Sequence, residues 1–209
     1  MTEEPALSLR ERKKLDTRRA LSDAALELAF ERGLDNVLRE DIAARAGVSV
    51  RTFNNYFSGK WEALAYRQVD RLRRSTDILR SRPADEPMWT ALTESVLAPL
   101  EAEIDAAGHG PPTAKQLAVI RALFDVPGAH AAITAGLQDD FVAAIAERSG
   151  TDPHHDLYPR LAAGMVVAVV RSSFEVYVRA DPPVQITAVL RRAFSLAADV
   201  VPGSGVPAP

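Results

Sequence analysis

The chain has 209 residues, with 25 Lys and Arg against 28 Asp and Glu, and 47% of its residues are hydrophobic. This length fits one sizeable domain or two small ones, and the apolar fraction is that of a globular protein. The absence of cysteine excludes a disulfide-built scaffold, a thiolate metal site and a cysteine nucleophile. No apolar stretch follows the N-terminus, and the longest apolar run, Leu161 to Val170, is far shorter than the roughly 20 residues that a membrane helix needs. We therefore expect a soluble, cytoplasmic protein with no membrane segment.

Positive charge is concentrated in the first part of the chain. Residues 1–82 carry 17 Lys and Arg against 13 Asp and Glu, a net charge of +4, whereas residues 83–209 carry 8 against 15, a net charge of −7. A basic end on an acidic body indicates that only the first part meets a polyanion such as nucleic acid. An ordinary solvated surface is the alternative explanation for such a charge run.

Helical periodicity predicts an all-α fold. Between Leu21 and Ala29, apolar residues recur at i, i+3, i+4, i+7 and i+8, and the stripe stops at Gly33, a natural helix cap. The polar break PADEP at 83–87 divides the chain into a first domain over 1–82, which includes a connecting helix from Lys60, and a helical domain over 83–201. Residues 202–209 are expected to be a disordered tail. Further helices are predicted over 40–46, 50–57, 89–106, 113–124, 129–148, 156–179 and after residue 183.

Residues 38–57 (LREDIAARAGVSVRTFNNYF) fit a helix-turn-helix motif at each constrained position. Ala43 is small where two helices cross, Gly47 tolerates the positive φ of a tight turn, and Ser49 can cap the second helix. The outward residues offer a guanidinium, a hydroxyl and two carboxamides, which suit base edges and phosphates in a major groove. An ordinary helical hairpin with a polar face is the alternative. The expected shared core consists of Ile42, Ala46, Val48, Phe53 and Tyr56, and the expected outward residues are Val50, Arg51, Thr52, Asn54 and Asn55.

The segment GLDNVLREDIAARAGVSVRTFNNYFSGKWEAL resembles the DNA-binding domain of the tetracycline-repressor (TetR) family of bacterial regulators. The DIA..AGVS core, the pair Tyr56-Phe57, the following Lys60 and the preceding AALELAFERG all match. The specific resemblance covers about the first 70 residues. It implies a three-helix DNA-binding domain at the N-terminus and a C-terminal helical domain that forms a homodimer and binds a small-molecule effector.

The resemblance also implies roles for individual residues. Arg51, Thr52 and Asn55 would read bases, and Asn54 could read a base or hold a phosphate. One departure concerns the threonine that usually precedes the supporting helix, because this chain has Val37-Leu38-Arg39 there. The hydroxyl contact is therefore missing or is replaced by Arg39, for which a solvated surface arginine is the alternative. The residues expected to hold phosphates or to position the motif are Arg39, Ser49, Asn54, Tyr56 and Lys60.

The apolar helix from Leu161 to Val170 predicts a dimer. It is apolar on all sides and must be covered all round, and Gly164 and Ala168, four residues apart, permit close approach of a partner helix. With the final helix it would form a two-fold four-helix bundle. A helix buried within a monomer is the alternative. The final helix would contribute Leu190, Phe194 and Ala197 to this interface.

An effector pocket is harder to locate from the sequence. Several aromatic residues and one histidine could line it, although aromatic residues at helical spacing are also typical of a plain core. Arg171 interrupts an apolar helix and would suit an anionic effector, with an i, i+4 pair to Glu175 as the alternative. The other candidates are Trp89, Phe124, His130, Phe141, Phe174 and Tyr177.

No catalytic or metal site and no cofactor are expected. His154-His155-Asp156 is the only His and carboxylate cluster, and adjacent residues on a turn point in different directions. The sequence has no P-loop, G-x-G-x-x-G or G-x-S-x-G motif. We therefore predict a ligand-released repressor that binds a palindromic operator in double-stranded DNA. The alternative is a DNA-binding regulator without a small-molecule effector, controlled by a protein partner or by its abundance.

Overall fold

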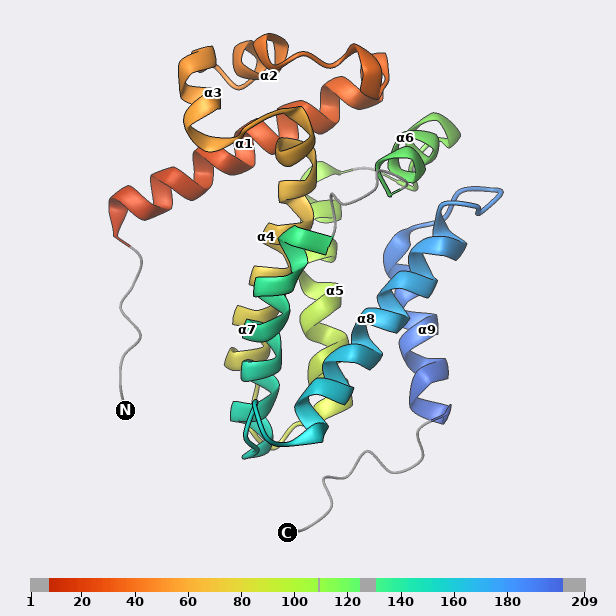
Figure 1. Cartoon of the computed structure of the whole chain (residues 1–209). Coiled ribbons are helices and arrows are strands. Elements are labelled where there is room, and N and C mark those ends of the chain that lie inside the picture. The colour runs from red at the N-terminus through yellow and green to blue at the C-terminus, as the bar shows by residue number, and fades with distance from the viewer. Residues whose placement is uncertain (1–7, 109, 125–130, 201–209) are drawn as a thin grey trace. The chain divides into compact units, whose positions relative to one another are not determined.

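The computed structural model describes residues 8–108, 110–124 and 131–200, and its regular elements within these ranges are all helical (Figure 1). The predicted all-α fold is confirmed. The chain forms two compact units, Met1–Gln68 (unit 1) and Val69–Pro209 (unit 2), and the division falls inside the long helix α4 (Lys60–Ser81). The predicted tail, residues 202–209, lies outside the described residues. No described helix combines the length and apolar character that crossing a membrane requires.

Unit 1 contains α1 (Leu9–Arg32), the short turn η1 (Leu34–Asn36), α2 (Arg39–Arg45), α3 (Val50–Tyr56) and the first part of α4. Helix α1 begins with a capping box, in which Ser8 and Glu11 satisfy each other's backbone N–H groups, and it ends at Gly33. Helix α2 packs on both α1 and α3. The fully buried side chains of this unit include Leu21, Leu28, Val37, Ile42 and Phe53.

Unit 2 contains the rest of α4 with α5 (Met88–Ala107), α6 (Ala114–Phe124), α7 (Ala131–Ser149), α8 (Leu157–Tyr177) and α9 (Ile186–Val200). Helix α8 packs on α7 and α9, and α9 also packs on α5 (Figure 1). Just after the unit boundary, α4 is fastened to α5 because Arg71 and Arg74 both bind the Glu103 carboxylate. The core of this unit is one apolar cluster whose fully buried members include Leu79, Leu92, Leu97, Ile145, Leu190 and Phe194.

Candidate nucleic-acid interface

The turn between α2 and α3 has the geometry that the sequence predicts. Gly47 has φ +68°, and its backbone N–H donates to the Ala44 carbonyl at 3.1 Å. The Val48 N–H donates to the Ala43 carbonyl at 2.9 Å. A Cβ placed on Gly47 would meet no atom within 4 Å, so glycine is required by the backbone conformation and not by crowding. Ala43 is buried, as expected for a small residue where the two helices cross.

Helix α3 is held by a cap at one end and by a buried ring in its middle. The Ser49 hydroxyl accepts a hydrogen bond from the Thr52 backbone N–H at 3.1 Å, which confirms the predicted N-cap. Phe53 is fully buried, and so is Ile42 of α2. The other three residues expected in this core, Ala46, Val48 and Tyr56, are half-buried.

Three of the predicted contact residues stand together on the free face of α3. Arg51, Asn54 and Asn55 are exposed and lie at i, i+3 and i+4, so they share one side of the helix. Arg51 makes no ion pair with any other residue that the structure describes. The face therefore offers a guanidinium and two carboxamides whose donors and acceptors are open to a partner.

Thr52 differs from its neighbours. Its side chain is half-buried, and its hydroxyl lies 2.9 Å from the Ser49 hydroxyl. The two hydroxyls thus pair with each other at the start of α3. The structure shows Thr52 as part of the helix cap, and its expected role in reading bases stays a prediction.

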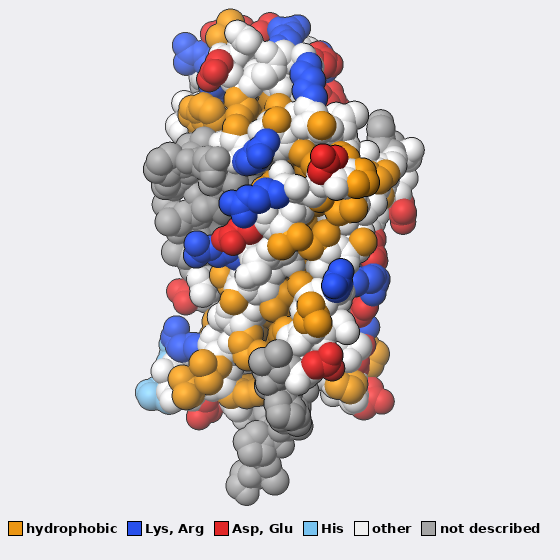
Figure 2. Space-filling model, turned by 90° about the vertical axis from the view of Figure 1, so that its right-hand side faces the viewer, with side chains coloured by type: hydrophobic (Ala, Val, Ile, Leu, Met, Phe, Trp, Pro, Cys, Tyr) orange, Lys and Arg blue, Asp and Glu red, His pale blue; other side chains and the backbone are white. Residues whose placement is uncertain are grey.

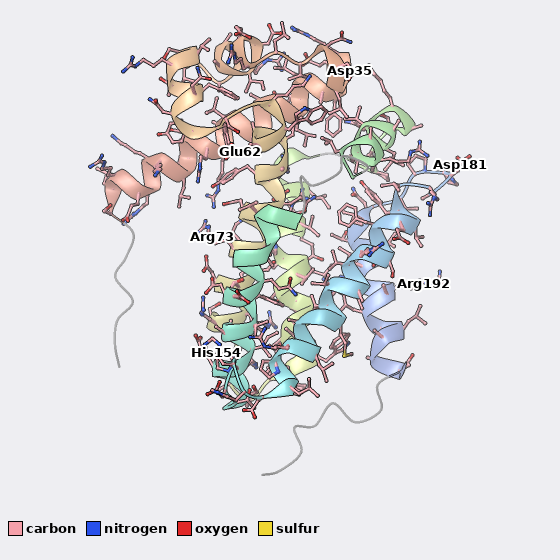
Figure 3. The ribbon with its side chains drawn as sticks, in the orientation of Figure 1. Asp35, Glu62, Arg73, His154, Asp181 and Arg192 are labelled. Carbon is pink, nitrogen blue, oxygen red and sulfur yellow. The ribbon has the colours of Figure 1, made fainter. Side chains whose placement is uncertain are left out.

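Lys60, expected to hold a phosphate, points back into unit 1. Its ammonium group donates to the carbonyls of Leu34 and Asp35, at 2.9 and 3.3 Å, and lies 5.2 Å from the centre of the Trp61 ring. Two of its three N–H donors therefore fasten the start of α4 to η1, where Asp35 is labelled in Figure 3. At the same end of α4, the Glu62 carboxylate accepts hydrogen bonds from the Ser58 backbone N–H and hydroxyl, just before the helix begins. No pattern in the sequence indicates this internal role of Lys60.

The start of α2 lacks a hydroxyl cap, as the departure at residues 37–39 predicts. Leu38 occupies the N-cap position without a side-chain hydrogen bond, and the Arg39 guanidinium pairs with Glu40 at 3.0 Å. Two hydrogen bonds lower the pKa of the Glu40 carboxyl. The larger effect comes from the backbone N–H of Glu40 itself, and the smaller one comes from the Arg39 side chain. Glu40 and Asp41 place negative charge in the first turn of α2, where it interacts favourably with the helix dipole.

Arg18 of α1 joins three elements of unit 1, a role that is absent from the predictions made from the sequence. Its guanidinium carbon lies 5.6 Å from the centre of the Phe57 ring and 5.3 Å from that of Tyr66. Its Nη2 donates to the Tyr56 carbonyl at the end of α3, at 3.3 Å. The signal was present in the sequence, because Arg18 precedes Ser22 and Ala25 by four and seven residues on the buried side of α1.

Arg45 fastens α2 to α1 in a similar way. It forms ion pairs with Glu27 at 3.2 Å and with Glu31 at 2.8 Å. The hydrogen bond from Arg45 lowers the pKa of the Glu31 carboxyl. The last residue of α2 and the last residue of α3 are therefore each tied to α1 through an arginine.

A second candidate surface lies in unit 2, on the outer side of α8 and α9. Gly164 and Ala168 are exposed there, and so are Leu161 and Val167, which are 54% and 50% exposed. Leu196 of α9 is 56% exposed. Figure 2 shows apolar side chains spread over this face. The sequence predicts that α8 is buried on all sides, but in the structure one side of this helix is exposed to solvent.

The residues expected from α9 at this surface need correction. Leu190 is 0% and Phe194 1% exposed, because both pack into the core of their own chain. They cannot present a surface to a partner. Ala197 is half-buried, and Arg192, labelled in Figure 3, is exposed on the same helix.

The candidate effector residues lie mostly in the core of unit 2. The Trp89 indole N–H donates to the Phe194 carbonyl at 3.0 Å, and the two rings are 5.5 Å apart. Phe141 and Tyr177 are buried, and burial raises the pKa of the Tyr177 phenol. Phe174 packs edge-on against Tyr177. His130 and the side chain of Phe124 lie outside the described residues.

Arg171, a residue expected in the effector pocket, lies instead on the surface of unit 2. Its side chain is 80% exposed and forms an i, i+4 ion pair with Glu175 at 3.3 Å. An arginine on the outer side of α8 does not line the interior of its own chain. The structure therefore favours the alternative that the spacing of the two residues already offered.

The N-cap of α3 generates a stability prediction. Replacing Ser49 with Ala removes the acceptor of the Thr52 N–H and lowers the free energy of unfolding by about 0.5–2 kcal/mol, measured by urea denaturation. Ser49→Asp is the matched control, because aspartate is an equally good N-cap, and it retains the wild-type stability. Equal losses in the two variants would contradict a capping role.

Comparison with known proteins supports the two-unit organisation. Residues 21–65 match the family of bacterial regulatory proteins named tetR, and residues 86–202 match the MftR C-terminal domain. The chain is 31% identical over 186 residues to the HTH-type transcriptional regulator TcmR of Streptomyces glaucescens, which covers 87% of this chain and 82% of TcmR.

Solved structures with the same fold are more distant in sequence. SmeT, the repressor of the Stenotrophomonas maltophilia multidrug efflux pump SmeDEF, superposes with a TM-score of 0.57 at 18% identity, over 93% of this chain and 96% of SmeT. FadR of Thermus thermophilus, solved with lauroyl-CoA, gives 0.54 at 20% identity, over 92% and 98%. The helix-turn-helix geometry, the family matches and the relationship to TcmR together establish that this chain belongs to the TetR family of DNA-binding transcriptional regulators.

Proposed function

We propose that the chain is a homodimeric, ligand-released repressor that reads a palindromic operator with α3 and carries out no catalysis. The observation that carries the proposal is the exposed face of Arg51, Asn54 and Asn55 on a helix fixed by its cap and by Phe53. Arginine pairs with two acceptors of guanine, and asparagine pairs with adenine, in the major groove. A helix with these three groups in one row is suited to reading several adjacent base pairs.

A homodimer is the second element of the proposal. The exposed side of α8 carries Leu161, Gly164, Val167 and Ala168, and a second copy of the same face would cover it through a two-fold axis. The two small residues let the facing helices approach closely. In the dimer, two α3 helices would enter successive major grooves about 34 Å apart, so the operator would be an imperfect palindrome.

A small-molecule effector is the third element of the proposal. Its support comes from related folds, since SmeT has been solved with triclosan and FadR with lauroyl-CoA. We infer a lipophilic effector for unit 2, whose interior is an apolar helical cluster. The close packing of Trp89 on Phe194 favours a second candidate, a regulator without an effector, and a thermal-shift screen separates the two.

Base reading by α3 predicts a loss of sequence preference in Arg51→Lys. Lysine keeps the charge but not the two-pronged hydrogen bonding, so affinity for the selected operator falls by about 1–3 kcal/mol per half-site. Affinity for random DNA and its salt dependence stay as in the wild type. The measurement is selection from a random duplex pool, followed by titration of the winning sequence. Unchanged preference in Arg51→Lys would contradict base reading by this residue.

The proposed dimer predicts dissociation in Val167→Glu, because two buried carboxylates would face each other across the axis. Light scattering at micromolar concentration should show a dimer for the wild type and a monomer for this variant. Leu9→Glu is the control, since Leu9 is 69% exposed on α1 and lies outside the proposed interface. A wild-type monomer would overturn the proposal.

Ligand release predicts a reciprocal effect that calorimetry measures. An effector that weakens operator binding a hundredfold must bind the free dimer a hundredfold more tightly than the operator complex, a difference of about 2.7 kcal/mol. Fatty-acyl compounds and other lipophilic molecules that raise the melting temperature are the ones to test. Equal affinity of such a compound for the two forms would rule it out as an inducer.

A further inference from the structure

The first two turns of α1 form an overhang that adds nothing to the core of unit 1. The helix begins at Leu9, but its buried residues begin only at Leu21, and every residue from Ser8 to Lys14 is exposed. Figure 1 shows this end of α1 running out past α2 and α3. Its side chains are therefore available to a partner outside the chain.

The overhang is strongly cationic. It carries Arg10, Arg12, Lys13 and Lys14 against one acidic residue, Glu11. The Glu11 carboxylate is already occupied, because it accepts hydrogen bonds from the Ser8 hydroxyl and backbone at 2.7 and 2.9 Å. Arg10, Lys13 and Lys14 form no ion pair with any residue in the described ranges. Among the described residues, these three cationic groups thus have no partner of opposite charge.

These charges do not serve the stability of α1. A cation in the first turn of a helix, such as Arg10, opposes the helix dipole, and neighbouring like charges repel each other. The capping box of Ser8 and Glu11 is what stabilises this end. Binding to a partner outside the chain explains why these residues are present although they destabilise the isolated helix.

The position of the overhang relative to α3 is fixed within unit 1. Arg10, Lys14 and Arg18 follow one another at intervals of four, and Arg18 donates to the carbonyl of Tyr56 at the end of α3. At a rise of about 1.5 Å per residue, Lys14 and Arg10 lie about 6 and 12 Å further along α1. The cations therefore begin beside the end of the helix that bears the base-reading groups.

We propose that Arg10, Lys13 and Lys14 bind backbone phosphates of the DNA duplex that flank the groove occupied by α3. This inference rests on the proposed function, since α3 brings the duplex to this side of unit 1. DNA carries one negative charge per about 1.7 Å of its axis, so phosphates lie within reach of long side chains along the overhang. Such contacts add affinity and no sequence preference.

The test is the salt dependence of DNA binding by Arg10→Gln/Lys13→Gln/Lys14→Gln, in which glutamine keeps good helix propensity. Each lost phosphate contact reduces the magnitude of the slope of log K against log salt by about 0.9, so a dimer that lacks six contacts loses about 5 units of slope. The sequence selected from a random pool is unchanged, and the melting temperature is equal or higher. Arg160→Gln, an exposed cation on α8, carries one such change per chain and keeps the wild-type slope.

The slope is measured on both the selected operator and a random duplex. If the triple substitution reduced the magnitude of the slope by less than about 3 units on both duplexes, the inference would be overturned, since counterion release would then involve other cations. Failure of the wild type to select any sequence would instead contradict the proposed function, while the random duplex still tests the overhang. A lower melting temperature or a changed selected sequence in the triple variant would also overturn the inference.

Discussion

A single side chain, Arg18 of α1, joins α3 to both of the long helices of unit 1. Helix α3 has only seven residues, too few to be stable as an isolated helix in water. The Arg18 guanidinium lies against the rings of Phe57 and Tyr66 and binds the last carbonyl of α3, so one side chain joins α1, α3 and α4. A cation held over aromatic faces contributes about 0.5–2 kcal/mol. The helix that bears Arg51 is therefore held at its last residue by a side chain of α1.

The other attachments act in the same sense. Ser49 supplies the first turn of α3 with its acceptor, Lys60 fixes the start of α4 to η1, and Arg45 ties α2 to α1. Each attachment satisfies backbone groups or charges that a short helix leaves open. The polar residues of the motif thus fall into two groups. Some bind other parts of unit 1 and hold the motif together, and others are exposed and available for contact with DNA.

These two groups explain which features of the motif could be predicted from the sequence. Backbone requirements are visible in single residues, so Gly47 and Ser49 predicted the turn and the cap correctly. The direction that a long side chain takes is not visible in the same way. The family resemblance implies a phosphate contact for Lys60, and the structure adds a hydrogen bond from its ammonium group to the Leu34 carbonyl. The periodicity of α9 likewise identified an apolar side at Leu190 and Phe194 without telling whether the same chain or a partner covers it. The exposed side of α8 became clear only once the packing of α7 and α9 was known.

The central claim is that α3 reads bases in the major groove, and methylation interference tests it most directly. Dimethyl sulfate marks the N7 atom of guanine in the major groove and the N3 atom of adenine in the minor groove. On a selected operator, the account predicts that guanine methylation blocks binding in two clusters separated by about one helical turn, 10–10.5 base pairs. Interference confined to adenine N3, or none at guanine in either half-site, would contradict it.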